Sequence, residues 1–317
     1  MTANLQNPIF QDETKAREWL EARVWANGPT CPHCGNADTA KITPLKGKAH
    51  RPGLYQCNEP ECREQFTVTV GTVFERSKIP LSKWLAALFL LVSSKKGISS
   101  HQAHRMLGIS YKSTWFMMHR LREAMRTGGL APLGGHGKTV EADETFIGKL
   151  ADVPRQHTGY AHKNTVLTLV ERGGAARSFH VEGISMAKLI PIIRANVARE
   201  TAMMTDQASW YRNLRSEADV ASHETVDHSK EEYVRGVVHT NTVEGYYSIF
   251  KRGMKGVYQH CSEKHLHRYL SEFDFRYSNR SALGTDDMMR AEKLAAGIVG
   301  KRLTYRRTNG EPQPQAY

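Results

Sequence analysis

The chain has 317 residues, 40% of them apolar, which is enough to bury a sizeable core and to form two or three domains rather than one. It contains no run of roughly eighteen apolar residues, and its N-terminal segment lacks a basic start followed by an apolar core. We therefore expect a cytoplasmic protein with no membrane partner.

The net charge of +12 is concentrated in one segment. Residues 76–126 hold ten lysines and arginines against one acid, Glu123. A polyanion is the natural partner, because lysines and arginines that neutralise phosphates release condensed counterions. A solvated basic face, or affinity for anionic lipid, would carry the same charge, so the motifs must decide between these partners.

In the first half of the chain, the pattern predicts a cysteine-rich segment between helices. Residues 10–25 favour an amphipathic helix, and the alternating residues 66–70 indicate a small strand beside the cysteines. Apolar side chains at spacings of three and four predict a helix from Pro80 to about residue 92. A second helix follows over residues 99–107, and a third begins at Ser110 or Ser113.

Five cysteines in a cytoplasmic protein are more consistent with metal ligands or free thiols than with disulfides. Cys31 and Cys34 form one knuckle, and Cys57 and Cys62 form another. Each knuckle offers two sulfurs, and together they complete the tetrahedron that a structural zinc ion requires. We therefore predict one structural Zn²⁺, which would fold a segment too small to bury a core of its own.

Residues 97–115 have the pattern of a helix-turn-helix. Ala103 and Leu107 would pack inward, Gly108 would permit the turn, and the third helix would enter a DNA major groove with its first residues. A plain helical hairpin is the alternative, and the local positive charge favours DNA binding. We predict DNA contacts here by Lys95, Lys96, Arg105, Lys112, Ser113, Thr114, Arg120 and Arg122, with Lys112 and Ser113 near base edges and Arg120 or Arg122 near phosphate.

The second half of the chain changes character. Residues 128–137, with five glycines and a proline, are the predicted interdomain linker. Beyond it the pattern predicts three strands, a helix, a strand, a helical turn, a strand and two helices: 139–147, 164–170, 176–181, 186–197, 202–205, 209–214, 223–226, 242–252 and 263–277. This order is typical of a ribonuclease-H-like domain, an α/β fold with a mixed sheet and flanking helices.

Acidic residues fall on three of these predicted elements. Asp143 and Glu144 lie within the first strand, where alternation turns them to opposite faces. Asp206 lies just past the fourth strand, at a strand end where α/β sheets build sites, and Glu244 lies on the helix after the fifth strand. Asp143, Asp206 and Glu244 around an open cavity would suit two Mg²⁺ ions, whereas the alternative is that they are surface salt-bridge acids.

The helix that carries Glu244 has two unlike faces. Helical spacing places Asn241, Glu244, Ser248, Lys251 and Lys255 on one face and Val243, Tyr246 or Tyr247, and Phe250 on the other. Glu244 can then face the other acids while the lysines face phosphate. We predict DNA contacts by Lys251, Arg252 and Lys255.

The ordered motifs are CPHCG from residue 31, GTVFE from 71, KGIS from 96, EADET from 141, TD from 205 and HTNTVEG from 239. In this order they resemble the DDE-type insertion-sequence transposases that carry an N-terminal zinc ribbon, the ISXO-like family. The resemblance implies movement of a DNA element, by a cut-and-paste or a copy pathway, through hydrolysis and strand transfer at its terminal inverted repeats.

By the same resemblance, Asp143 and Asp206 are the first two catalytic acids, Glu244 is the third, and Lys251 is a phosphate contact. Some relatives are described with an asparagine as the third catalytic residue, so Asn241, one helical turn from Glu244, is the alternative. We rank Glu244 first because a carboxylate neutralises Mg²⁺ better than an amide does.

The expected domains are an N-terminal helix (1–25), a zinc ribbon (26–76), a helix-turn-helix domain (77–127), the linker (128–137), a catalytic domain (138–282) and a C-terminal tail (283–317). The expected cofactors are one Zn²⁺ and two Mg²⁺ or Mn²⁺ ions. The expected partners are double-stranded DNA, both element ends and target, and at least one further copy of the chain. We expect a bacterial protein that joins the nucleoid when bound to DNA. A DNA-binding regulator, or a captured transposase that binds DNA without mobilising it, is the alternative function.

Overall fold

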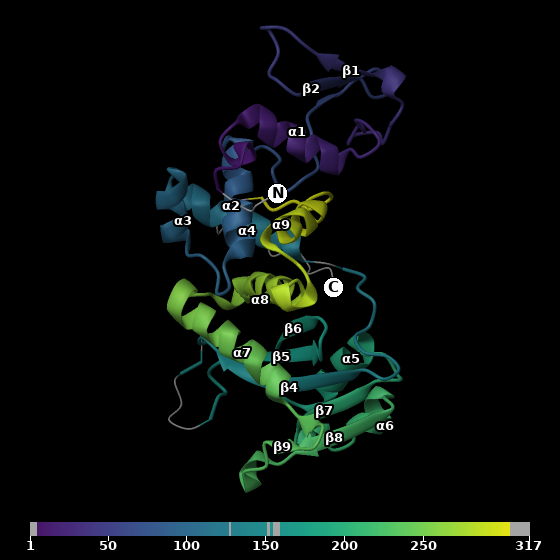
Figure 1. The fold of residues 1–317 in the computed structure, drawn as a ribbon, viewed down its shortest axis with the longest axis vertical. Coiled ribbons are helices and arrows are strands. Elements are labelled where there is room, and N and C mark those ends of the chain that lie inside the picture. The colour runs from purple at the N-terminus through teal and green to yellow at the C-terminus, as the bar shows by residue number, and fades with distance from the viewer. Residues whose placement is uncertain (1–4, 127, 151–152, 155–158, 305–317) are drawn as a thin grey trace. The chain divides into compact units, whose positions relative to one another are not determined.

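Figure 1 shows the fold of the chain as a computed structural model, which describes residues 5–126, 128–150, 153–154 and 159–304. These residues form two compact units. The first lies within Met1–Ser94, Ile98–Thr127 and Asp286–Tyr317, and the second lies within Lys95–Gly97 and Gly128–Thr285. A search of the described helices finds none that is both long and apolar enough to span a bilayer.

The first unit begins with a helix and a small sheet. Asp12 caps helix α1 (Glu13–Val24), because its carboxylate accepts a hydrogen bond from the Lys15 N–H at 2.9 Å. The sheet has three antiparallel strands, β1 (Ile42–Leu45), β2 (Leu54–Cys57) and β3 (Gln65–Phe66). Residues 67–70 do not continue β3 as predicted. They turn, and the Val70 N–H bonds to the Thr67 carbonyl at 3.0 Å.

Three helices follow in the predicted order: α2 (Leu81–Ser93), α3 (Ser100–Leu107) and α4 (Tyr111–Met125). Ser99 caps α3, and Ser110 caps α4 by accepting from the Ser113 N–H at 3.2 Å. Gly108 ends α3 in the left-handed conformation (φ 61°), which costs a glycine little. Ala103 and Leu107 are buried, so the inward packing expected for this pair is confirmed.

The segment predicted to be a C-terminal tail is in part a helix of the first unit. Helix α9 spans Asp287–Ala296, packs against α2, α1 and α4, and buries Leu294 completely. After it, the Val73 N–H bonds to the Ile298 carbonyl at 3.1 Å, and Gly300 bonds back to Gly71. The tail prediction is therefore wrong for residues 287–300, and residues 305–317 lie outside the described residues.

The second unit contains a mixed five-stranded sheet in the order β6-β5-β4-β7-β8. Its strands are β4 (Thr139–Ile147), β5 (Asn164–Glu171), β6 (Ala176–Val181), β7 (Ala202–Asp206) and β8 (Ser222–Val226). β4, β5 and β6 pair antiparallel as a meander, whereas β7 lies parallel to β4, and β8 lies parallel to β7. This is the predicted ribonuclease-H-like order, and Figure 1 shows the strands side by side in it.

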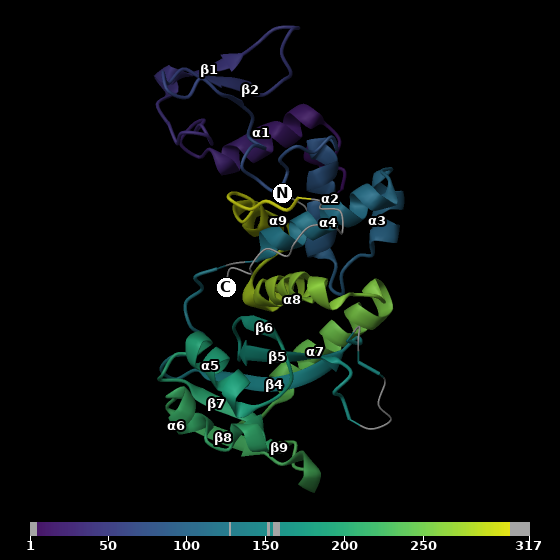
Figure 2. The same ribbon diagram turned by 180° about the vertical axis from the view of Figure 1, so that it is seen from behind.

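Helices cover both faces of this sheet. One face packs on α5 (Met186–Asn196), the short turn η3 (Ser209–Tyr211) and α6 (Leu214–Ala218), which lie on the near side in Figure 2. The other face packs on α7 (Asn241–Gly253) and α8 (Glu263–Ser278), and α7 crosses the near side in Figure 1. A two-stranded hairpin, β9 (Val234–Arg235) and β10 (Val238–His239), leads into α7.

The predicted linker is shorter than expected. Leu133 is buried in the core beside α5, and its N–H bonds to the Asn196 carbonyl at 2.8 Å. The N–H of Gly135 bonds to the Thr201 hydroxyl at 2.9 Å. Residues 133–137 therefore belong to the second unit rather than to a free connection.

Candidate active site and metal centre

The cysteines of the two predicted knuckles lie together. The sulfurs of Cys31 and Cys62 are 3.7 Å apart, as are those of Cys34 and Cys57, and all four lie within 4.8 Å of one another. Four thiolates around Zn²⁺ at about 2.3 Å would be separated by about 3.8 Å along each tetrahedral edge. The donor set and its spacing therefore fit a zinc ion.

Local structure prepares this cluster. Gly35 takes a left-handed conformation (φ 76°) and closes the first knuckle, with its N–H bonded to the Cys31 carbonyl at 2.8 Å. The backbone N–H of Asn36 lowers the pKa of the Cys34 thiol, whereas burial raises the pKa of the Cys31 thiol, so the four sulfurs do not all favour the thiolate unless a cation binds. Around the sulfurs, Trp25, Tyr55 and Phe66 pack with ring centroids 5.2 to 5.8 Å apart.

Strand β4 presents acidic side chains to both faces of the sheet. Glu144 points to the α5 face, where it accepts hydrogen bonds from Trp210 Nε1 at 3.2 Å and from the Tyr211 hydroxyl. Asp143 points to the α7 face, and the Tyr247 hydroxyl lies 2.5 Å from its backbone carbonyl. The opposite orientation of the two neighbours, expected from strand alternation, is confirmed.

The strand register places Asp206 beside Asp143. Glu141 of β4 is paired with Met204 of the parallel strand β7. Two residues further along each strand, Asp143 and Asp206 stand at the same level, and there β7 ends. The Asp206 carboxylate also accepts the Ala208 N–H at 3.1 Å, which holds the turn that follows.

Glu244 comes to the site on the first turn of α7. Its side chain is exposed, as are those of Asn241, Ser248, Lys251 and Lys255 on the same face. Val243, Tyr246, Tyr247 and Phe250 are buried against the sheet on the other face, so the predicted division of this helix is confirmed. Glu244 Oε1 lies 3.3 Å from the Thr240 hydroxyl and 3.7 Å from His228 Nε2.

The acids influence one another electrostatically. Burial raises the pKa of Asp143 to about 8, and the charges of Glu144, Asp206 and Glu244 add to this effect. Burial likewise raises the pKa of Glu144 to about 7, although the hydrogen bonds from Tyr211 and Trp210 oppose it. Such crowding of carboxylates disfavours their ionised forms unless a cation neutralises them.

The carboxylates therefore have the donor chemistry of a Mg²⁺ site, but their oxygen atoms do not converge on a single position. Within the described residues, the four cysteines alone bring three or more potential ligand atoms within 4.8 Å of one another. The oxygens of Asp143, Asp206 and Glu244 do not meet that spacing, and Mg²⁺ does not require them to, because this ion retains water and substrate phosphate among its ligands.

The structure corrects three of the predicted DNA contacts. Arg120 and Arg122 are only 6% and 1% exposed, and Arg120 donates to the Glu75 carbonyl at 2.7 Å. Thr114 is fully buried and donates to the Ser110 carbonyl at 3.0 Å. These side chains are buried within the first unit, which leaves them little surface to offer to DNA. Lys95, Lys96, Arg105 and Lys112 are exposed, and Ser113 is half-buried; Lys95 and Lys96 belong to the second unit.

Four residues with structural roles near the acids were not predicted from the sequence. Glu141 and Arg172 hold the start of α7, and Trp210 and Tyr211 hold Glu144. A glutamate between the apolar residues Val140 and Ala142 was the available signal for Glu141, because a buried charge needs partners. No comparable signal marks Arg172, whose role depends on the fold.

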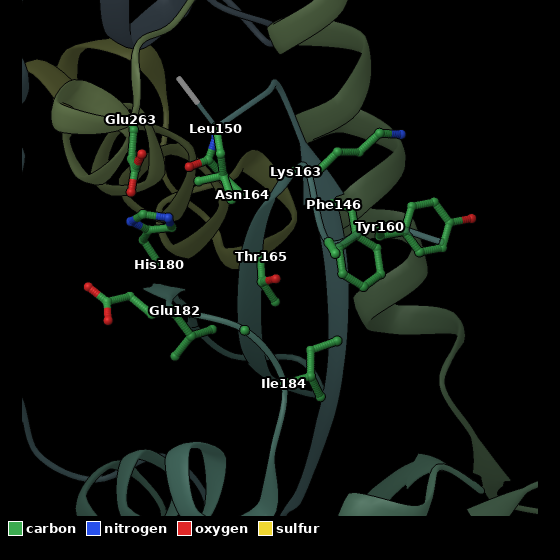
Figure 3. A pocket seen from close by; sticks show the side chains of 13 residues that line it. Phe146, Leu150, Tyr160, Lys163, Asn164, Thr165, His180, Glu182, Ile184 and Glu263 are labelled. Atoms are coloured by element: carbon green, nitrogen blue, oxygen red, sulfur yellow. The ribbon is translucent and has the colours of Figure 1, made fainter. Parts of the chain in front are cut away.

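A separate pocket of about 440 Å³ opens farther along β4 (Figure 3). Phe146 and Tyr160 stack on one side of it with their centroids 4.2 Å apart, and His180, Glu182 and Glu263 lie on the other side. Phe146 is three residues from Asp143 and points to the opposite face of the sheet. The pocket is therefore distinct from the site of the acids.

Comparison with known proteins agrees with this architecture. Residues 11–65 match the transposase zinc-ribbon domain, and residues 132–278 match the ISXO2-like transposase domain. A protein of Halobacterium salinarum described as "Uncharacterized protein in transposable element ISH50" is 28% identical over 282 residues, which cover 84% of this chain and 91% of that protein.

The four-cysteine ribbon, the ribonuclease-H-like sheet and these matches define a DDE-type transposase domain behind a zinc ribbon. The chain thus carries an ISXO2-like transposase domain, preceded by a transposase zinc-ribbon domain. The relative named above is archaeal, so the expectation of a bacterial source has no support from it.

Proposed function

We propose that this protein is a transposase that binds the terminal inverted repeats of an insertion sequence and catalyses Mg²⁺-dependent DNA cleavage and strand transfer. The observations that support the proposal are the β4–β7 register, which sets Asp143 level with Asp206, and the charge of Glu244, which adds to the raised pKa of Asp143, in an ISXO2-like transposase domain. A protein that only binds DNA has no use for an aspartate, Asp143, whose pKa is raised by burial and further by the charges of Asp206 and Glu244.

Asp143, Asp206 and Glu244 would hold two Mg²⁺ or Mn²⁺ ions, which activate a water or a 3′-hydroxyl and neutralise charge on the departing oxygen. The role of the protein itself would be to position the three carboxylates. Asp143 lies on β4, Asp206 ends β7 and Glu244 lies on the first turn of α7, so the sheet and this helix would set the separations of the three carboxylates. Lys251 and Arg252 are exposed on α7, and Lys255 is exposed in the π-helical turn that follows it (Met254–Tyr258); all three would bind the DNA backbone and orient the scissile phosphate.

The first unit would recognise the element ends. One Zn²⁺ on Cys31, Cys34, Cys57 and Cys62 would stabilise the ribbon, while the exposed first turn of α4 would present Lys112 and Ser113 to a major groove. Arg105 on α3 would contact phosphate. Two or more copies of the chain would be needed to act on both ends of one element, which is the basis for proposing a homo-oligomer on DNA.

The test is incubation of the purified protein with DNA that carries the element ends, in Mg²⁺ and in a chelator. Nicked ends and joined products are expected in Mg²⁺ alone. Tight binding of the ends without any cleavage in Mg²⁺ or Mn²⁺ would instead identify the alternative, a DNA-binding regulator or a captured transposase that no longer mobilises DNA.

A further inference from the structure

Glu141 occupies a special position on β4. It lies two residues before Asp143 and therefore points to the same face of the sheet, and it is completely buried. A buried carboxylate is costly unless hydrogen bonds and a counter-charge compensate for its lost hydration. The partners of Glu141 therefore indicate what it does.

The first set of partners is the N-terminus of α7. Glu141 Oε2 accepts the backbone N–H groups of Thr242 at 2.7 Å and Val243 at 2.9 Å, and its Oε1 accepts the Thr242 hydroxyl at 2.7 Å. The N-cap residue, Thr240, makes no side-chain capping bond of its own. Glu141 thus caps α7 from a neighbouring strand, and its negative charge lies at the positive end of the helix dipole.

The second partner is Arg172, which follows β5. Its Nε donates to Glu141 Oε1 at 2.6 Å, and its terminal nitrogens donate to the carbonyls of Val237 at 2.7 Å and His239 at 2.8 Å. His239 Nδ1 also lies 3.2 Å from Glu141 Oε1. Glu141 therefore joins β4 to the hairpin that leads into α7 as well as to the helix.

This junction sets the position of Glu244. Glu244 directly follows Val243, whose N–H is bound by Glu141, and its own N–H bonds to the Thr240 carbonyl at 3.1 Å. Because the Glu244 side chain is exposed, the orientation of the first helical turn decides where its carboxylate lies. A shift of that turn would move Glu244 relative to Asp143 without changing any of the three acids.

We propose that Glu141 is a positioning residue for divalent-cation binding: by capping α7 from β4, it holds Glu244 at the separation from Asp143 that the cations require. This inference rests on the proposed function of the acids. The side-chain length is specific, because aspartate would withdraw the carboxylate by one methylene. The charge is specific too, because the amide of glutamine would place a donor against Arg172 or against the backbone N–H groups.

Glu141→Gln tests the proposal in the full-length protein, and Glu272→Gln is the matched control. Glu272 is equally buried in the same unit and pairs with Arg276 and Tyr258 on the side of α8, so its loss costs a comparable ion pair without touching the start of α7. A general loss of stability should affect both variants, whereas a positional effect should appear in Glu141→Gln alone.

The readouts are Mn²⁺ binding, followed by the paramagnetic signal of free Mn²⁺, and amide hydrogen exchange. We expect Glu141→Gln to bind Mn²⁺ about tenfold more weakly than the native protein, and to exchange the Thr242 and Val243 amides faster. Glu272→Gln should match the native protein in both. Should Glu141→Gln fail to fold, Thr242→Val removes one donor to Glu141 and should weaken Mn²⁺ binding in the same direction by less.

The inference would be overturned if the folded Glu141→Gln variant bound Mn²⁺ with native affinity. Where Thr242→Val replaces that variant, native affinity in Thr242→Val would overturn it. Equal weakening of Mn²⁺ binding in Glu272→Gln would also overturn it. Absence of Mn²⁺ binding by the native protein would overturn both this inference and the metal site. If the native protein binds Mn²⁺ and cuts no DNA, the proposed function fails, while the Mn²⁺ affinities of the variants still decide the role of Glu141.

Discussion

Asp143 is crowded by other carboxylates, and burial with these neighbours raises its pKa to about 8. The unfolded chain would release this proton near pH 4, so between about pH 4 and pH 8 the folded protein binds a proton that the unfolded chain lacks. The free energy of unfolding should therefore fall as the pH rises through this window. Glu144, with a pKa of about 7, acts in the same direction.

This gives a prediction for the metal-free protein. In a chelator, the melting temperature of the second unit should be lower at pH 8 than at pH 5, and Asp143→Asn should lessen that difference, because an amide does not titrate. Calorimetry of the native and variant proteins at the two pH values measures it. A native protein more stable at pH 8, in the same chelator, would contradict the account of the crowded acids.

Whether Glu244 or Asn241 is the third catalytic residue is also a question about single side chains. Both are exposed on the first turn of α7, and Glu244 contributes to the raised pKa of Asp143. We expect Glu244→Gln to slow cleavage by about a hundredfold or more, since a lost metal ligand removes several kcal/mol of transition-state stabilisation. Asn241→Ala should cost much less in an assay with intact and pre-nicked ends. The reverse order of effects would make the asparagine the third ligand.

Among the secondary structure elements, the five strands of the mixed sheet could be predicted from sequence almost to the residue, whereas the hairpin of β9 and β10 was not predicted. β4 and β6 have the predicted bounds, because apolar alternation and glycine turns define them locally. Helix α9 was not predicted, because its buried side chains contact helices that lie far away in the sequence, α1, α2 and α4. The prediction for Thr67 to Val70 was wrong in the opposite sense, because a strand was expected and none forms. The β-branched residues of this segment find no partner strand among the described residues.

The candidate site residues likewise divide into those that could be predicted from the sequence and those that could not. Asp143, Asp206 and Glu244 could be proposed because each lies on an element whose place in the sheet order is predictable. The burial of Arg120 and Arg122 could not be predicted, because a count of charges along the chain treats every arginine as exposed. α4 contacts α2, α3 and α9, so much of its surface is covered. Charge on a helix therefore indicates DNA binding only after its buried face is known.

The zinc ribbon provides a prediction for one structural element. Metal analysis should find one zinc per chain, and Cys57→Ser should lose it and unfold the ribbon, because the small sheet buries few apolar side chains besides the cysteines. The matched control is Cys261→Ser, a cysteine outside the cluster, which should retain the full zinc content. A zinc-free protein with an intact ribbon would rule out a structural role for the metal.

For the whole molecule, the chain after the catalytic domain completes the first unit. Leu294 of α9 is fully buried there, so Leu294→Ala should lower the free energy of unfolding of the first unit by about 2–5 kcal/mol. Met289→Ala on the exposed side of the same helix should change it by less than about 0.5 kcal/mol. Denaturant titration measures both, and equal effects would show that α9 does not pack as described.

The central claim is that DNA recognition and DNA cleavage reside in different units of one chain. Asp143→Asn in the full-length protein separates them, because it alters the acid site and leaves the ribbon and helices α2 to α4 unchanged. Asp219→Asn is the control: this exposed aspartate ends α6 in a left-handed conformation that asparagine also tolerates.

The decisive measurement follows binding and cleavage of element ends in Mg²⁺ by the native protein and these two variants. The account predicts that all three bind the ends with similar affinity, that the native protein and Asp219→Asn cut them, and that Asp143→Asn cuts them slower by about two orders of magnitude or more. Normal cleavage by Asp143→Asn would contradict the account.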